Sequence, residues 1–394
     1  MLSYAVAGTA AQALFLSSHG TSQLPQVWLL VALASAVAVA AVNTAGRYLN
    51  VVRLFVWASL ISTLALFLLL VAQLKHIPYV AYGLYVWKDI YIIVLVELFW
   101  TFANIAFGVR TATRTYGLFC AAGSLGAIAG SEWVSVLAQH IGTVAVMWTL
   151  IPILLLGAWG CTTLAHKIQI PMPAGRLSVT QTMRHSLGDG LDVLRKSPYL
   201  LLLMGLVAIV QVVLTLNDFQ FNAAVQATYT TLDARTVALA DVGILINIFS
   251  FVLQMATGLL LRFVGMPITM LAIPTLLCVS LGATLWQPQY STAALCQIVG
   301  KCTDYSLFRA CKEILYIPLS YAEKTRGKAL VDIFVYRVAK GGVGLFLLAL
   351  TGLGTHFGVK LLTLGLCGVW LMLAWRIVRR YKRLQPGGPG SSAS

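Results

Sequence analysis

The stretch KIQIPMPAGRLSVTQTMRHSLGDGLDVLRKS, residues 167–197, is a polar interruption in a chain that is otherwise strongly apolar. The 394 residues are 59% hydrophobic and only 10% charged, and the mean hydropathy is +0.86. A soluble domain needs about a quarter of its residues charged to cover its surface. We therefore infer that lipid is the solvent over most of this surface, and that the polar stretch is a loop between membrane spans.

Apolar runs long enough to cross a bilayer recur on both sides of this loop. We predict twelve spans, six before the loop and six after it, and we assign the N-terminal run to the first span because it lacks the basic start of a signal peptide. The predicted spans lie near residues 2–18, 26–45, 52–73, 89–109, 117–138, 143–166, 198–216, 237–261, 266–285, 291–318, 331–352 and 357–378.

The distribution of Lys and Arg between the loops tests this count. With the N-terminus in the cytoplasm, eighteen cations fall on the cytoplasmic side and only four on the other, namely Lys75, Lys88, Arg235 and Lys360. Such a bias is the topology signal of an inner-membrane protein. The same bias explains the net charge of +15, so we predict no nucleic-acid partner. It also predicts a bacterial inner-membrane protein with both termini in the cytoplasm.

Two six-helix bundles joined by a cytoplasmic loop are the layout of the major facilitator fold, in which substrate binds between the halves near the midplane. We therefore expect an all-α polytopic membrane protein. Its parts are an N-terminal bundle at 1–166, a central loop at 167–197, a C-terminal bundle at 198–380 and a disordered Gly/Pro/Ser-rich tail at 381–394. Nothing in the sequence demands an oligomer, so we expect a monomer in the lipid bilayer.

Motifs of soluble enzymes are missing from the sequence. It has no GxxxxGK[ST] phosphate loop, no HExxH and no GxSxG, and the seven cysteines lack metal-ligand spacing. We therefore predict that the chain is not an enzyme and that it needs no cofactor and no metal.

The tenth predicted span is unusual in its charge. Ionisable residues are costly inside a membrane unless they are paired or face water. At about 100° per residue, those of this span fall within one half-circle of a straight helix. They are Lys301, Asp304, Arg309, Lys312 and Glu313.

The eleventh predicted span adds Asp332, Arg337 and Lys340. Pairing of Lys301 with Asp304 and of Arg309 with Glu313 would lower the cost of insertion. The two spans nevertheless hold five cations against three anions. The surplus of two positive charges predicts a water-filled path for an anion.

The first half of the chain has fewer such signals. Glu97 lies within the fourth predicted span, where we expect it to pair with a cation of the tenth or eleventh span or to act as a gating or proton-coupling carboxylate. In AAGSLGAIAG, residues 121–130, Gly126 and Gly130 lie on one helical stripe. That spacing favours close helix packing rather than nucleotide binding.

YSLFRACKEILYIPLSYAEKTRGKALVD (residues 305–332), with VYRVAKGG after it, closely resembles the signature of the bacterial and plastid ATP/ADP translocases. VELFWTFAN and AAGSLGAIAG are similar to that family's fourth and fifth spans. The resemblance implies a twelve-span, facilitator-like carrier that exchanges nucleotides. The family's functional positions fall on Glu97, Lys301, Lys312, Glu313, Asp332, Arg337 and Lys340.

Combined with the charge pattern, this gives a hypothesis for the site. The cations neutralise phosphates, and the carboxylates hold the cations and switch partners between inward-facing and outward-facing states. The proposed substrate-binding residues are Lys301, Arg309, Lys312, Arg337 and Lys340. The proposed pairing and gating residues are Glu97, Asp304, Glu313 and Asp332.

Two departures from the family pattern leave alternatives open. The first span carries no charge, where the family normally has basic residues, and Ala310 stands where the family has proline. Either the N-terminus is truncated or the chain is a divergent relative. The alternatives to ATP/ADP exchange are transport of another organic anion and a degenerate homologue that serves as a membrane anchor or assembly partner. Substrate, coupling ion and direction of flux stay open.

Overall fold

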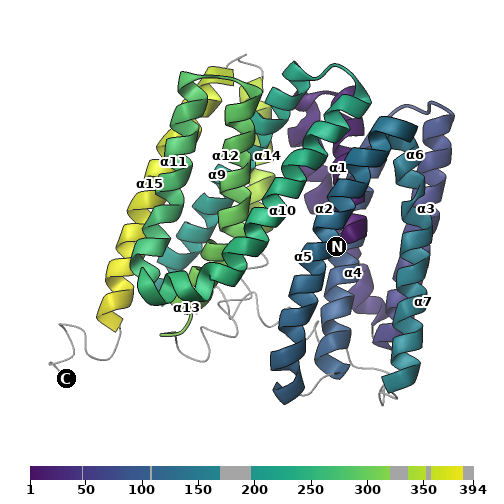
Figure 1. Ribbon diagram of the computed structural model, residues 1–394, viewed down its shortest axis with the longest axis horizontal. Helices are drawn as coiled ribbons and strands as arrows, with labels where there is room; N and C mark the ends of the chain where they lie inside the picture. Colours follow the sequence, from purple (N-terminus) through teal and green to yellow (C-terminus); the bar gives the residue numbers. More distant parts are fainter. Residues whose placement is uncertain (47, 107–108, 169–196, 320–335, 352–355, 385–394) are drawn as a thin grey trace. The chain divides into compact units, whose positions relative to one another are not determined.

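The computed structural model describes residues 1–46, 48–106, 109–168, 197–319, 336–351 and 356–384, and every regular element within them is a helix (Figure 1). The predicted all-α class is therefore confirmed. In the first part of the chain the helices are α1 (Leu2–Ser18), the short η1 (Thr21–Gln23), α2 (Leu24–Ala45), α3 (Val51–Leu74), α4 (Val80–Ala106), α5 (Val109–Ile141), α6 (Thr143–Trp148) and α7 (Leu150–Ile168).

The later helices follow the stretch that the structure leaves undescribed. They are α9 (Pro198–Thr228), α10 (Leu232–Phe263), α11 (Met266–Trp286), α12 (Tyr290–Thr303), η2 (Asp304–Phe308), α13 (Arg309–Leu315), α14 (Tyr336–Thr351) and α15 (His356–Leu384). Eight described helical segments are, by length and composition, apolar enough to cross a membrane. The other predicted spans correspond to α1, α4, the α12–η2–α13 run and α14.

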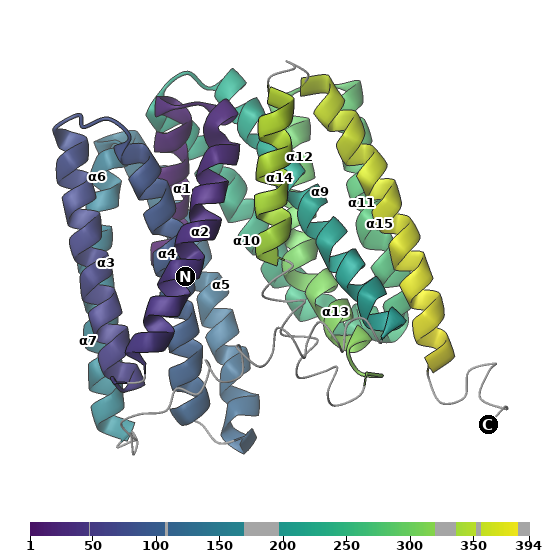
Figure 2. The same ribbon diagram turned by 180° about the vertical axis from the view of Figure 1, so that it is seen from behind.

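The chain forms two compact units. Unit 1 contains α1 to α7 together with the segment Val225–Asn247, which is the end of α9 and the first half of α10. Unit 2 contains the remainder of α9 and α10 and the helices α11 to α15. Figure 2 shows the same helices from behind. The two halves expected from sequence thus differ from the structural units in the placement of Val225–Asn247.

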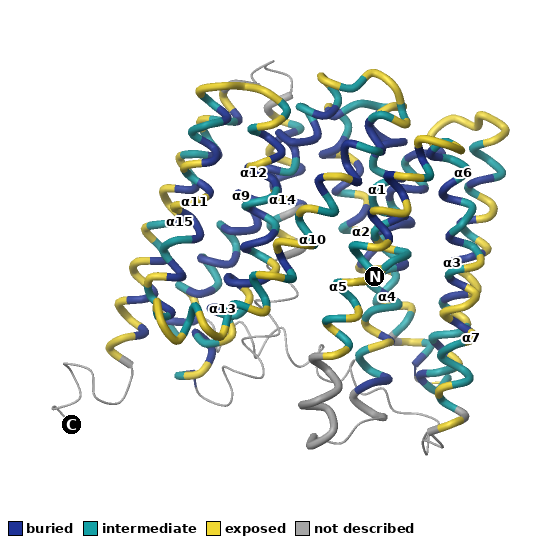
Figure 3. The backbone as a smooth tube through the Cα atoms, in the orientation of Figure 1, coloured by how far each residue is buried: buried dark blue, intermediate teal, exposed yellow. Residues whose placement is uncertain are grey.

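Apolar side chains on the outer faces of the helices are exposed, as a bilayer requires. On α3, Trp57, Ile61, Leu64 and Leu68 are each more than half exposed, and their spacing of four, three and four residues places them on one face. Figure 3 shows this exposed face along α3. Such a stripe would be an aggregation hazard in water, so it marks a lipid-facing surface.

Unit 1 is held together by close packing of α1 on α5. A Cβ atom built on Gly130 would lie 2.5 Å from the carbonyl oxygen of Leu2, and one on Gly126 would lie 3.4 Å from the Leu2 nitrogen. Only a residue without a side chain permits this approach at Gly130. In unit 2, the core is formed by α9, α11, α13 and α15, where Leu203, Leu277, Cys311 and Trp370 are almost fully buried.

Three predicted span boundaries differ from the ends of the helices. The fourth span was predicted to begin at residue 89, but α4 begins at Val80, so Lys88 lies inside the helix and is buried rather than in a loop. The neighbouring carboxylate of Asp89, 2.9 Å from Lys88 Nζ, neutralises the charge and makes burial possible. Arg235, also predicted to lie in a loop, is buried in the first turn of α10.

The seventh span was predicted to end at residue 216, but α9 continues to Thr228. The polar run NDFQFN, residues 217–222, looks like a span end in the sequence. Its side chains instead bond other helices: Asn217 Nδ2 donates to Gln297 Oε1 at 2.8 Å, and Gln220 Nε2 donates to Thr363 Oγ1 at 2.7 Å. Satisfied polar groups of this kind are tolerated inside a helical bundle.

Candidate functional site

The charged span is not a continuous α-helix. Between α12 and α13, residues Asp304–Phe308 form one π-helical turn, η2. A π turn inserts one extra residue into an α-helix and is often found at functional sites. The side-chain amide of Gln254, on α10, donates to the backbone oxygen of Tyr305 in this turn at 3.4 Å, so a neighbouring helix supports the irregular backbone.

The inserted residue changes which side chains share a face. On a straight helix, the five ionisable residues would spread over roughly 180° at about 100° per residue. Because of the extra residue, the side chains after Phe308 lie about 100° further back around the helix axis than on a straight helix. The five ionisable side chains therefore occupy an angular range of roughly 100° instead of roughly 180°. We call this set the charged face; it consists of Lys301, Asp304, Arg309, Lys312 and Glu313.

Burial agrees with this register. Cys302, Thr303, Cys311 and Leu315 are buried and lie opposite the charged face, although they come from both sides of the π turn. Arg309 and Glu313 are exposed, while the other three charged residues are half-buried. The π turn therefore keeps one polar and one apolar side along the whole span.

Lys301 is paired across helices. Its Nζ lies 2.7 Å from Asp218 Oδ2 on α9, and the other oxygen of that carboxylate accepts a hydrogen bond from Gln297 Nε2. Asn217 Nδ2 donates a hydrogen bond to Gln297 Oε1 at 2.8 Å and so fixes the orientation of that amide. We call this the α9–α12 polar cluster. It fixes the ammonium group at the start of the charged face.

The sequence predicted Asp304 as the partner of Lys301 and did not single out Asp218. The signal was present, because a carboxylate in a long apolar segment is costly and requires a partner. It was overlooked because the predicted seventh span stopped at residue 216. Including Asp218 reduces the positive surplus of the charged spans from two to one.

Asp304 lies in the field of several cations. Lys301, Lys312 and Arg309 are all close enough to interact electrostatically with its carboxylate. The structure therefore brings these four predicted residues together around one half-buried carboxyl group. An anionic ligand at this face would compete with Asp304 and Asp218 for the same cations.

The other predicted site residues lie elsewhere. Glu97 is exposed on α4 of unit 1 and forms no ion pair with any described residue. Arg337 and Lys340 belong to the first turns of α14 in unit 2, whereas Asp332 lies outside the described residues.

Unit 1 also buries a pair of charges that was not predicted from the sequence. Lys88 Nζ bonds Asp89 Oδ1 at 2.9 Å and lies 3.9 Å from the centre of the Tyr85 ring. Only 6% of the lysine side chain is exposed. This neutralised and enclosed ammonium group has the character of a structural ion pair rather than a ligand site.

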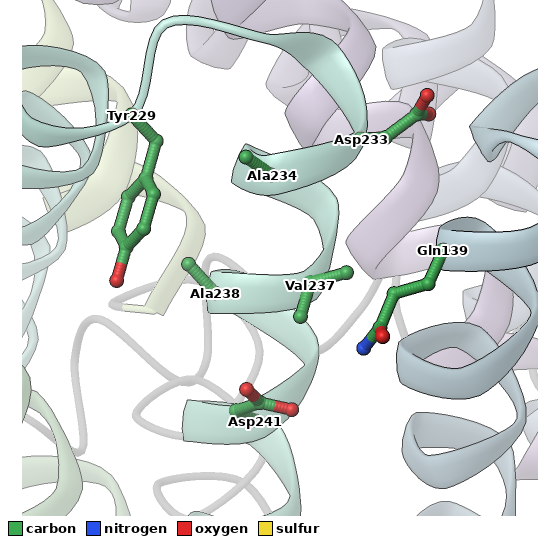
Figure 4. Close-up of a pocket in the computed structure, with 7 residues that line it drawn as sticks. All are labelled: Gln139, Tyr229, Asp233, Ala234, Val237, Ala238 and Asp241. Atoms are coloured by element: carbon green, nitrogen blue, oxygen red, sulfur yellow. The ribbon is translucent and has the colours of Figure 1, made fainter.

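A separate hollow of about 360 Å³ lies in unit 1 between α5 and α10 (Figure 4). Gln139 points toward α10 on the side where Asp233 and Val237 lie, and Tyr229 lies on the other side of that helix. The residues that line the hollow include carboxylates but no cation, so it does not suit a phosphate. Among the described residues no group of three or more His, Cys, Asp or Glu is placed to hold a metal ion.

Comparison with known proteins decides the family. The model of the TLC ATP/ADP transporter family matches residues 63–287 and 289–381, most of the chain. The chain belongs to this family. The resemblance noted in the sequence is thereby confirmed, and the matched region includes α9, the π turn and most of α15.

Individual relatives are distant in sequence. The chain is 25% identical over 314 residues to ADP,ATP carrier protein 1 of Chlamydia muridarum, a match that covers 70% of this chain and 59% of that protein. It is 23% identical over 280 residues to the chloroplastic ADP,ATP carrier protein 1 of Arabidopsis thaliana, covering 64% of this chain and 45% of that one. The chain thus spans about half the length of these relatives.

A solved structure supports the fold. The nucleoside transporter NupG superposes with a TM-score of 0.67 at 12% identity, covering 97% of this chain and 96% of that chain. At this identity the likeness concerns architecture alone. It confirms the prediction of a polytopic, facilitator-like helical transporter fold.

Proposed function

We propose that this multi-pass membrane protein exchanges ATP and ADP across a bilayer by alternating access. The observation that carries the proposal is the charged face of the α12–η2–α13 run, which lies within the region matched by the ATP/ADP transporter family model. A cluster of cations inside a span has no purpose in a passive helix, because each is costly unless it meets an anion or water.

The chemistry of the face suits phosphate groups. Lys301, Arg309 and Lys312 supply ammonium and guanidinium donors that form charge-assisted hydrogen bonds with phosphate oxygens. Arg337 and Lys340 on α14 are proposed to complete the set. Glu97, Asp304, Glu313 and Asp332 are proposed to hold the cations in the absence of substrate and to change partners during the cycle.

Asp218 gives this proposal a physical basis for exchange. The Asp218 carboxylate lies 2.7 Å from Lys301 Nζ. With Asp218 included, the two charged spans still hold five cations against four anions, and moving this surplus charge through a low-dielectric region is unfavourable. A carrier loaded with nucleotide therefore reorients more readily than an empty one, and counter-exchange follows rather than net uptake.

The topology belongs to the same proposal. We propose that both termini lie in the cytoplasm of a bacterium and that the protein lies in its inner membrane; the bias of Lys and Arg between the loops supports this. We propose that one chain is sufficient, with the sequence halves 1–166 and 198–380 acting as the two moving bundles joined by 167–197.

A second candidate is transport of another organic anion by the same scaffold. It is favoured by α1, which contains no ionisable side chain apart from a tyrosine. A phosphate-binding site lacking cations in this helix suits a ligand with fewer negative charges than ATP.

The test is uptake of labelled ATP into intact cells that express the chain, with unlabelled ADP, AMP, inorganic phosphate and a dicarboxylate as competitors. Saturable uptake competed by ADP, and lost in surface-expressed Lys312→Ala and Lys340→Ala variants, supports nucleotide transport. Uptake competed by the dicarboxylate but not by ADP supports the second candidate. No uptake by correctly inserted protein removes ATP as the substrate.

A further inference from the structure

The segment Val225–Asn247 is part of unit 1 although it lies in the middle of two helices whose other ends are in unit 2. α9 belongs to unit 2 up to Ala224, and α10 returns to unit 2 at Ile248. Any motion of the two units must therefore bend both helices or detach this segment. We call Val225–Asn247 the latch segment.

Arg235 is the centre of its attachment. The buried guanidinium donates to the carbonyl oxygen of Leu16 at 3.3 Å and to Ser17 Oγ at 3.1 Å, both in the last turn of α1. It also donates to the carbonyl oxygens of Gln226 and Tyr229 at the end of α9, at 3.3 and 2.8 Å. One cation thus caps the C-terminal ends of two helices, where the helix dipole favours positive charge.

Asp233 makes the complementary contact. Its Oδ1 accepts hydrogen bonds from the backbone nitrogen of Thr143 at 2.8 Å and from Thr143 Oγ1 at 2.7 Å, at the first residue of α6. A carboxylate at this position caps the positive end of the helix. Nearby, the hydroxyl oxygens of Thr143 and Thr236 lie 2.7 Å apart.

Two further bonds complete the attachment. Ser135 on α5 donates to Asp241 Oδ1 at 2.6 Å, and the backbone nitrogen of Thr21 donates to Gln226 Oε1 at 2.7 Å. Part of the space between α10 and α5 is the hollow of Figure 4. Elsewhere the segment is packed, since Ala240 is fully buried and a Cβ atom built on Gly243 would lie 3.3 Å from Ser131 Oγ on α5. Polar bonds at a few points therefore hold the segment together with apolar contacts.

We propose that the latch segment is a releasable gate at the end of the carrier where α1 ends and α10 begins, closed by Arg235 and Asp233 as helix caps. Its contacts break when access opens at that end. Side-chain hydrogen bonds suit this role because water can replace them, whereas bending α9 and α10 would break backbone bonds within the helices. The inference rests on the proposed transport function, and the topology argued above makes this the non-cytoplasmic end.

The first test needs no substrate. Thr236 is fully buried in the closed latch, so a Thr236→Cys variant should react slowly with a membrane-impermeant maleimide added from outside the cell. Adding Arg235→Ala should raise the labelling rate about tenfold because the opened state becomes more populated, and Arg235→Lys should raise it less. Thr231→Cys, on the exposed connection between α9 and α10, is the control that should label equally fast in every background.

The proposal is overturned if the Thr236→Cys thiol labels as fast as the Thr231→Cys thiol with Arg235 intact, or if Arg235→Ala leaves the labelling rate at position 236 unchanged. Either result bears on the gate and not on the substrate, because no nucleotide is used. Surface expression measured for each variant separates gate opening from misfolding, since a misfolded variant does not reach the membrane at normal amounts.

The second test locks the gate. In a Thr143→Cys/Thr236→Cys variant, the two sulfur atoms replace hydroxyl oxygens 2.7 Å apart, so oxidation should join them. The cross-link should abolish uptake, and a reductant should restore it. The matched control is Ser280→Cys, which can pair with the native Cys296, 3.5 Å from Ser280 Oγ within unit 2, and should leave uptake unchanged. Full uptake with the 143–236 cross-link complete would contradict the proposal.

Discussion

Lys301 Nζ lies 2.7 Å from Asp218 Oδ2, although the two residues are far apart in the sequence and belong to different helices. Gln297 holds the second oxygen of that carboxylate. The pair fixes one cation of the charged face and neutralises its charge. This relationship connects the fold of unit 2 to the proposed exchange.

Replacing Asp218 by Asn should impair transport more than folding. The side chain keeps its shape but loses the charge that neutralises Lys301, which leaves a partly buried cation without its partner. Because about a quarter of each side chain is exposed, we expect a moderate effect, about a tenfold loss of maximal uptake. The measurement is uptake normalised to surface expression.

Two variants serve as controls for this prediction. Asp218→Glu keeps the charge and should retain most activity. The double variant Asp218→Asn/Lys301→Gln removes both charges, so its thermal stability in detergent should return toward that of the wild type while uptake stays low. Equal uptake by Asp218→Asn and wild type would contradict the role of the pair.

Inserting one alanine after Phe308 should rotate α13 by about 100° relative to α12, which moves Arg309, Lys312 and Glu313 off the face that they share with Lys301. We expect loss of uptake with protein still inserted, because the composition of the span hardly changes. Deleting Ser306 is the control: it removes the extra residue of the π turn, restores ordinary α-helix and leaves the charged face in register, so uptake should be retained.

The apolar side of α13 would be rotated as well, so a milder variant is useful. Gln254→Leu removes the amide that donates to the Tyr305 backbone oxygen and leaves the chain length intact. It should reduce uptake partially. If the insertion variant transports like the wild type, the register of the charged face has no functional importance.

Gly130→Ala should destabilise unit 1. The added methyl group would lie 2.5 Å from the Leu2 carbonyl oxygen and 3.0 Å from Ala5 Cβ, so α1 must shift. Overpacking of this kind costs about 1–3 kcal/mol. The same substitution at Gly205, where nothing lies within 4 Å, should be neutral or slightly stabilising, since alanine favours helix. Thermal melts in detergent compare the two, and equal melting temperatures would refute the packing argument.

Lys88→Met should be strongly destabilising. The change leaves the Asp89 carboxylate without its ammonium partner in a buried site, and breaking a buried pair costs about 3–5 kcal/mol. Lys88→Met/Asp89→Asn should recover much of the loss because no unpaired charge remains. Thermal melts in detergent measure both variants. If the double variant is no more stable than the single one, the pair contributes something other than mutual neutralisation.

The helical architecture was predictable because apolar length and loop charge are properties of local sequence. Failures came where polar groups inside the membrane are satisfied by distant partners. The predicted end of the seventh span at residue 216 followed from the polar run that begins at Asn217, but α9 continues because Gln297 and Thr363 bond that run. Lys88 was predicted in a loop because its enclosure by Tyr85 and Asp89 depends on packing.

The candidate site was predictable in composition but not in geometry. A straight-helix projection placed the charges of the tenth span on one half-circle. No local sequence pattern predicted the π turn, which reduces the angular range that these side chains occupy. Asp218 was missed because its partner lies on another helix, and Arg235 because its bonds are to carbonyl oxygens at the ends of α1 and α9. The roles of the individual site residues remain predictions.

The central claim is obligatory exchange of nucleotides, and the most direct measurement is uptake of labelled ATP by vesicles that contain the purified protein. One set of vesicles is loaded with ADP and another with buffer alone. We predict saturable uptake into the ADP-loaded vesicles, little into the empty ones, and none in either with Lys312→Ala. Equal uptake in both sets would contradict exchange, and absence of uptake in both sets by folded wild-type protein would contradict nucleotide transport itself.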